Sequence, residues 1–216
     1  YKHCQDNKKD FYYIDRPYWG ESRATPYWMR CVKNQHVKTF VDHRPDDRFK
    51  QQFKDPVKSF HKNGTYVLVV PPSHAMAEMF DGKHWLDNTI KVLKDNTDRE
   101  IIVREKPYNP KAVIDGEGKM VPGKSANNQP PKPFEWDKVH AVVTFNSSIS
   151  IKALTNGVPA FANFDNPCMP VCEQDFSKIE TPRYEDPRPV LHSLAYNQFT
   201  QEEFRSGYYM EILDGR

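Results

Sequence analysis

The chain has 216 residues, of which 38% are hydrophobic and 13% aromatic, and its formal net charge at pH 7 is +2. This composition is typical of a globular protein with one sizeable core and excludes a disordered chain. The near balance of 31 basic and 29 acidic residues excludes a uniformly basic nucleic-acid-binding coat. No apolar run reaches the roughly 20 residues that a membrane-spanning helix needs. No signal-peptide pattern opens the chain, so we expect a cytoplasmic protein.

The four cysteines do not follow a zinc-binding pattern. Three residues separate Cys168 from Cys172, and no second Cys or His pair stands at the spacing that a zinc site requires. We therefore interpret Cys4, Cys31, Cys168 and Cys172 as free thiols, which suits a reducing compartment.

Residues 1–62 are polar, aromatic and irregular, and we interpret them as a reduced or truncated N-terminal portion. Short strands are expected at residues 11–14 and 38–41, and a charged linker is expected at residues 45–55. No segment in this portion has the apolar spacing of an amphipathic helix.

Residues 63–216 alternate between strand and helix patterns. Continuous apolar runs at residues 65–70 and 141–145 are typical of strands buried on both faces of a parallel sheet. Residues 85–96 have helical apolar spacing, and residues 100–106 form another strand-like run. The alternation predicts an α/β domain with a Rossmann-like, mostly parallel sheet.

Two further patterns complete the expected fold. The segment from Tyr108 to Phe134 is rich in Pro, Gly, Lys and Asn and predicts a long loop. Thr200 and Glu203 have the spacing of a capping box and predict the start of a final helix.

The strongest functional pattern is the turn formed by Asn146, Ser147 and Ser148. A buried strand precedes it, a short helix at residues 149–156 follows, and Gly157 is expected to cap that helix. Backbone amides and the positive end of the helix dipole favour an anion at such a helix start. The alternative is that Ser148 simply caps the helix.

Two other strand ends carry polar groups that suit a diphosphate. Ser73 follows the first strand, and Arg104 and Lys106 end the second. The carboxyl ends of parallel strands meet at one edge of the sheet, which is where ligands gather. Cations and a hydroxyl there would bind phosphate oxygens. The alternative for each is an ordinary loop residue at a wet edge.

The run from Val142 to Pro159 resembles the donor-binding segment of GT-B glycosyltransferases. It is most similar to capsular-polysaccharide transferases and to glycosyltransferase-like proteins of tailed phages, in which a strand leads into a Ser-Ser or Ser-Asn turn, a short helix and Gly-x-Pro. The residues that match this pattern are Ser147, Ser148, Ala153, Gly157 and Pro159. Stretches at residues 13–20, 85–107 and 192–207 are similar to other parts of the phage proteins.

The resemblance implies transfer of a sugar from a nucleotide-diphosphate donor, expected to be UDP-linked, to an acceptor. The acceptor is either a modified base in phage DNA, within the host cytoplasm, or a capsular or surface glycan. Asp15 is the candidate general base, and His192 is the candidate contact for the diphosphate or the leaving group. The alternatives are a turn carboxylate and a structural histidine. Lysines in the loop at residues 106–138 would lie along DNA or would be merely solvated.

Three departures from the family pattern favour a second reading. Lys152 stands where the family often has a glutamate, which is implied to bind the donor ribose, and lysine accepts no hydrogen bonds. Arg16 replaces the family's histidine, and a full GT-B enzyme has two Rossmann-like domains. The alternative is therefore a non-catalytic binding or structural protein built on a degenerate GT-B half-domain. The chain has no Asp-x-Asp pair, so metal-independent chemistry is expected.

Overall fold

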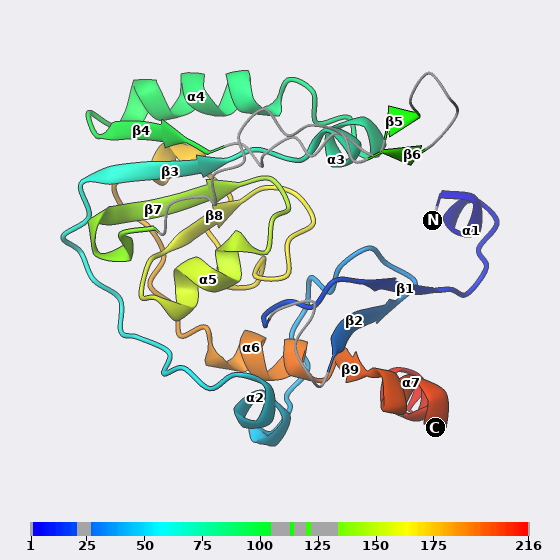
Figure 1. Ribbon diagram of the computed structural model, residues 1–216. Helices are drawn as coiled ribbons and strands as arrows, with labels where there is room; N and C mark the ends of the chain where they lie inside the picture. The colour runs from blue at the N-terminus through cyan, green and yellow to red at the C-terminus, as the bar shows by residue number, and fades with distance from the viewer. Residues whose placement is uncertain (1, 21–26, 105–112, 115–119, 122–133, 216) are drawn as a thin grey trace.

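The computed structural model describes residues 2–20, 27–104, 113–114, 120–121 and 134–215. The protein is a mixed α/β structure in which a four-stranded parallel sheet lies beside a small antiparallel sheet (Figure 1). The parallel sheet has the order β4-β3-β7-β8, and its strands are Glu100–Val103, Tyr66–Val70, Val139–Thr144 and Ala160–Ala162.

The antiparallel sheet joins distant parts of the chain. Its order is β1-β2-β9, formed by Tyr12–Asp15, Trp28–Lys33 and Gln198–Thr200. The strand β9 therefore comes from residues 63–216 but pairs with β2 from residues 1–62. A third pair, β5 (Val113–Ile114) and β6 (Met120–Val121), falls within the segment that the sequence predicts as a loop.

The parallel sheet is buried because its side chains alternate between two apolar clusters. Val67 and Val69 of β3 face the cluster that includes Trp85 and Leu93 of α4 (Trp85–Asn96). Leu68 and Val70 face the other cluster, beneath α5 (Ile149–Thr155) and α6 (Arg188–Ala195). Figure 1 shows α4 on one side of the sheet and α5 and α6 on the other. The continuous apolar runs predicted this burial on both faces.

All four strands of this sheet point the same way, as expected. Val69 is in register with Val103, and Val70 with Thr144, which in turn pairs with Ala162. From β3 the chain passes through α4 to β4 on one side, and from β7 it passes through α5 to β8 on the other. The strand order therefore reverses between β3 and β7, whose carboxyl ends lie side by side.

The expectations for residues 1–62 need correction. The segment 38–41 is not a strand, because Lys38 is buried in an ion pair with Asp42 instead of alternating along a sheet. The expected linker at 45–55 contains α2 (Asp47–Gln52), which buries Arg48 and Phe49 without forming an apolar stripe. The strand β2 and the short helix α1 (Lys2–Asp6) were not expected.

The C-terminal capping box is confirmed. Thr200 accepts a hydrogen bond from the amide of Glu203, whose carboxylate accepts one from the amide of Thr200. The helix that it opens, α7 (Gln201–Ser206), is not the last one. Gly207 turns the chain with a φ of 81° into α8 (Tyr208–Asp214).

A buried charge network ties the segment after β2 to α6. The Lys38 ammonium donates to Asp42 and, over 2.9 Å, to the side-chain oxygen of Asn197. The Ser193 hydroxyl and the Arg44 guanidinium also donate to the Asp42 carboxylate. Burial acts to raise the pKa of Asp42, but these hydrogen bonds from Lys38, Ser193 and Arg44 outweigh it and lower the pKa to about 2.

We expect Asp42→Asn to destabilise the fold by about 3 kcal/mol at pH 7, because the buried Lys38 charge loses its counter-ion. The pKa of Asp42 lies below its ordinary value of 3.8, so its stabilisation is complete above pH 4 and disappears as the pH falls to about 2. Urea unfolding should show the difference between the wild type and this variant shrinking over that range. Asp46→Asn, which breaks the exposed Lys50–Asp46 pair, should cost less than about 1 kcal/mol at any pH. An equal loss in both variants would contradict the buried network.

The glycine after α5 is required by its surroundings. Asn156 is the C-cap, one residue before the expected Gly157, which adopts a φ of +74°. A Cβ on Gly157 would lie 2.1 Å from the carbonyl oxygen of Ser59.

We therefore expect Gly157→Ala to lower the free energy of unfolding by more than the roughly 1–2 kcal/mol that a left-handed conformation costs a non-glycine residue. The control is Gly20→Ala, where φ is +84° and no atom of the described residues lies within 4 Å of the added Cβ. Gly20→Ala should show the conformational cost alone. If chemical denaturation shows the same loss of unfolding free energy for Gly157→Ala and Gly20→Ala, the backbone near Ser59 moves away from the added Cβ without cost.

Candidate functional site

The candidate site is the edge at which β3 and β7 end. The hydroxyl of Thr144, the last residue of β7, donates to the carbonyl of Val70, the last residue of β3, over 2.8 Å. Beyond these residues the segment after β3 leads to α3 (His74–Met79), and the segment after β7 leads to α5. In open α/β sheets a crevice for ligands lies at this position, where the strand order reverses.

The turn after β7 satisfies its own backbone amides. The Ser147 hydroxyl accepts from the amide of Ile149 at 3.3 Å, and the Ser147 carbonyl accepts from the amide of Ser150 at 3.3 Å. Ser148 occupies the N-cap position and is exposed, but its side chain makes no capping bond. The expectation of bare amides at the start of α5 is therefore wrong for Ile149 and Ser150, and the capping role falls to Ser147 instead of Ser148.

A buried asparagine that the sequence did not single out holds this turn in place. Asn166 is fully buried, and its side-chain oxygen accepts from the Ser150 hydroxyl at 2.8 Å and from the amide of Cys168 at 2.9 Å. Its side-chain nitrogen donates to the carbonyl of Ser147 at 3.2 Å. In the sequence Asn166 precedes a proline and is typical of a turn, so its contact with residues far earlier in the chain has no local signal.

Asn146 presents the one feature of the turn that points to a ligand. Its side-chain nitrogen is buried and has no hydrogen-bond partner within the part of the chain that the structure describes. Buried polar groups are nearly always paired, so a buried donor left unpaired at this edge calls for an explanation. An acceptor atom of a bound molecule would provide one.

Aromatic rings occupy the α4 side of the same edge. Phe145, directly after β7, stacks on Phe164 with 4.3 Å between the ring centroids and an interplanar angle of 1°. Trp85 packs edge-on against Phe145 and donates its indole N–H to Asn163 at 3.0 Å. The space beside β7 on this face is therefore filled by protein side chains.

The remaining predicted phosphate contacts lie in different settings. Ser73 caps α3 by accepting from the amide of Met76 at 3.4 Å, a role that was not predicted from the sequence. The guanidinium of Arg104 lies 3.8 Å from the centroid of the Phe134 ring. Lys152 is exposed on α5. Lys106 lies outside the described residues.

The two predicted catalytic residues do not directly follow parallel strands. Asp15 ends β1, where its carboxylate forms an ion pair with Arg30 at 2.7 Å and accepts from the amide of Arg16 at 2.7 Å. His192 lies on α6 with its ring 5.3 Å from that of Phe49, and burial lowers the pKa of His192 below its usual value. Both side chains therefore contact protein groups in the structure.

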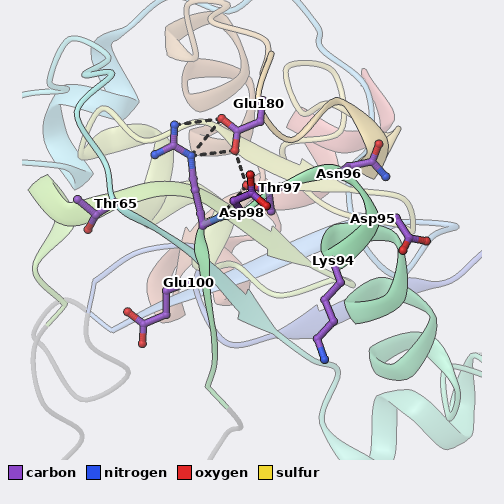
Figure 2. A pocket seen from close by; sticks show the side chains of 9 residues that line it. Thr65, Lys94, Asp95, Asn96, Thr97, Asp98, Glu100 and Glu180 are labelled. Carbon is purple, nitrogen blue, oxygen red and sulfur yellow. Dashed lines mark hydrogen bonds and ion pairs between the residues drawn. The ribbon is translucent and has the colours of Figure 1, made fainter.

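A polar hollow lies at the opposite, amino-terminal edge of the sheet (Figure 2). It has a volume of about 890 Å³ and includes Thr65 before β3 and Glu100 at the start of β4. The Glu180 carboxylate, labelled in Figure 2, accepts hydrogen bonds from the guanidinium of Arg99, with N–O distances of 2.9 to 3.1 Å. Ligands of parallel α/β sheets bind at the carboxyl edge, so we do not assign the donor site to this hollow.

The cysteines are free thiols, as expected. Cys31, Cys168 and Cys172 are buried and Cys4 is partly exposed. Burial raises the pKa of Cys168 to about 12, so its thiol stays protonated at neutral pH.

Comparison with known proteins adds no relative. No protein-family model matches the chain, and no curated protein matches it either. Among the described residues, no helix is both long and apolar enough to cross a membrane.

We expect Asn166→Ala to destabilise the protein by about 2–4 kcal/mol, because the Ser150 hydroxyl and the Cys168 amide lose their buried acceptor. The control is Asn163→Ala. Asn163 is exposed and accepts from the indole N–H of Trp85, so the loss of this bond should cost about 1 kcal/mol. Unfolding in guanidinium chloride measures the free energy of unfolding of both variants, and an unchanged m-value shows that the two changes can be compared. A smaller loss for Asn166→Ala than for Asn163→Ala would contradict the role of Asn166 in the turn.

Proposed function

We propose that this protein binds a nucleotide-diphosphate sugar where β3 and β7 end and that it takes part in transfer of the sugar to an acceptor. In this proposal the parallel sheet is a Rossmann-like domain that corresponds to the donor-binding half of a GT-B glycosyltransferase. The reversal of strand order between β3 and β7 is the observation that carries the proposal, because ligands of such sheets bind at this point.

The polar groups of the turn would then contact the donor. The buried amide of Asn146 would donate to an oxygen of the diphosphate, which supplies the acceptor that this nitrogen lacks. The Ser147 hydroxyl, now bonded to the amide of Ile149, would still have its own hydrogen to donate. The rigid turn, held by Asn166, would keep both groups in position without reorganisation on binding.

The leaving diphosphate would be stabilised by protein cations and not by a metal ion. Arg104 follows β4 at the same edge of the sheet, and Lys106 is the second predicted cation. His192 and Asp15 remain the candidates for leaving-group contact and for the base that takes the acceptor proton. A modified base in DNA and a surface glycan both present a hydroxyl that fits this chemistry, in a host cytoplasm if the chain is phage-encoded.

A specific observation also favours a non-catalytic binding protein as the second candidate. Asp15 is already paired with Arg30, so the candidate base is held in a structural contact. Lys152 stands on the exposed side of α5, and lysine cannot accept hydrogen bonds from a ribose. Such a protein would bind the nucleotide without turnover.

Thermal unfolding with UDP and a panel of other nucleoside diphosphates tests the proposal. A nucleotide at a hundred times its dissociation constant should stabilise the fold by roughly 2.7 kcal/mol. Asn146→Ala should weaken binding about ten-fold or more, since it removes the buried donor. The control is Asn156→Ala at the other end of α5, which should bind like the wild type.

Mass spectrometry of UDP-sugars incubated with the protein then separates the two candidates. Loss of the donor, with or without an acceptor, supports the transferase, and binding without loss supports the non-catalytic protein. If no nucleotide stabilises the fold, or if Asn146→Ala binds as well as the wild type, the assignment of the donor site is wrong.

A further inference from the structure

The edge strand β4 leads to an inference that does not rest on the proposed function. We propose that β4 pairs with β4 of a second copy of this chain, antiparallel about Ile102, so that the two parallel sheets join into one. The proposal rests on an edge of the sheet that no described strand covers, on the direction of the backbone groups along that edge, and on the order of charges in the strand.

The two edges of the parallel sheet differ. At the β8 edge, Glu173 covers the strand, because its carbonyl accepts from the amide of Ala162 at 3.0 Å and its amide donates to the carbonyl of Ala160 at 3.1 Å. At the other edge, β4 pairs with β3 alone among the described strands. Val103 of β4 is 40% exposed there. An uncovered edge strand is a template for pairing with another chain.

The backbone of β4 presents hydrogen-bonding groups at the spacing that antiparallel pairing needs. The amide of Arg104 donates to the carbonyl of Val69 at 2.9 Å, so the amides of the even-numbered residues face β3. Ile101 and Val103 therefore direct their amides and carbonyls outward. With Ile102 on the two-fold axis, Ile101 faces Val103 of the second copy, and each such pair exchanges two hydrogen bonds.

The charges of β4 are self-complementary in this one register. Glu100 begins the strand and Arg104 follows it, so pairing about Ile102 places each Glu100 opposite Arg104 of the other copy. These are non-hydrogen-bonded positions, where opposite side chains come closest. Glu100 is exposed, and the Arg104 guanidinium lies over the Phe134 ring, 3.8 Å from its centroid. This charge order favours a second copy over an unrelated strand as the occupant of the edge.

Helix α4 provides the additional surface that a stable dimer requires. Specific interfaces bury roughly 1,200–2,000 Å² in total, which is more than one pair of short strands supplies. A two-fold axis perpendicular to the joined sheet places both α4 helices on the same face. Leu86 and Ile90 of α4 are partly exposed, pack against the same cluster as Ile101, and line a groove of about 400 Å³. Val92 of α4 is also exposed.

Sedimentation equilibrium over a range of protein concentrations tests the dimer. The wild type should show a monomer–dimer equilibrium, and Val103→Pro should shift it at least ten-fold toward monomer. Proline removes an outward amide while leaving the bond from Arg104 to Val69 intact, and it is tolerated on edge strands. Circular dichroism and urea unfolding check that this variant is folded. A wild type that remains monomeric at every concentration overturns the proposal.

A charge exchange tests the register separately. Glu100→Arg and Arg104→Glu each place like charges opposite one another and should each weaken self-association at least ten-fold. The double variant should recover it, and an equimolar mixture of the two single variants should form a heterodimer. A wild-type dimer that neither variant weakens uses another surface, and a dimer not restored by the double variant has another register; either result overturns the proposal.

The same variants keep this proposal separate from nucleotide binding. Arg104 is also a predicted diphosphate contact. Its guanidinium can bind either the diphosphate or the Glu100 carboxylate of the second copy, but not both at once. Glu100→Arg leaves Arg104 in place, so its effect on association reports on the strand edge alone. Association that responds to Glu100→Arg while nucleotide binding is absent would support the dimer and reject the donor site.

Discussion

The structure depends on the buried pairing of β3 with β7. Both strands lie between two apolar clusters, so their backbone groups can be satisfied only by neighbouring strands. The continuous register from Val67 to Val70, which follows an irregularity after Tyr66, fixes where both strands end, and the Thr144 hydroxyl joins those ends. The candidate site, the α4 face and the α5 face are all positioned by this one contact.

The small antiparallel sheet depends instead on buried charges that join the two ends of the chain. The Arg48 guanidinium of α2 donates to the carbonyls of Ala195 and Gln198 and to the carboxylate of Glu203. The Lys38–Asp42 pair fastens the segment after β2 to α6 in the same way. A buried ion pair is strongly destabilising when one partner is removed, so these contacts make the position of β9 specific.

In the turn after β7, most of the polar groups described above bond to one another, and one donor has no partner in the described part of the chain. Ser147 and Asn166 use their polar groups to hold the turn, which makes it rigid but leaves it less able to offer amides to an anion. Within this turn, the side-chain nitrogen of Asn146 is a buried donor that has no partner among the described residues. Pre-organisation and unsatisfied polarity commonly occur together at binding sites, because bound molecules complete the hydrogen bonding that the fold leaves open.

Elements whose signal is local could be predicted from the amino-acid sequence. The apolar runs of β3 and β7, the helical spacing of α4 and the Thr200–Glu203 capping box follow from burial and hydrogen bonding within a few residues. The other elements and contacts depend on residues that are distant in the chain. β9 has three residues and forms only against β2, Arg48 is buried only because carbonyls from α6 and β9 surround it, and Asn166 meets the turn across many intervening residues. The free energy of these contacts comes from partners distant in the chain, so no local pattern encodes them.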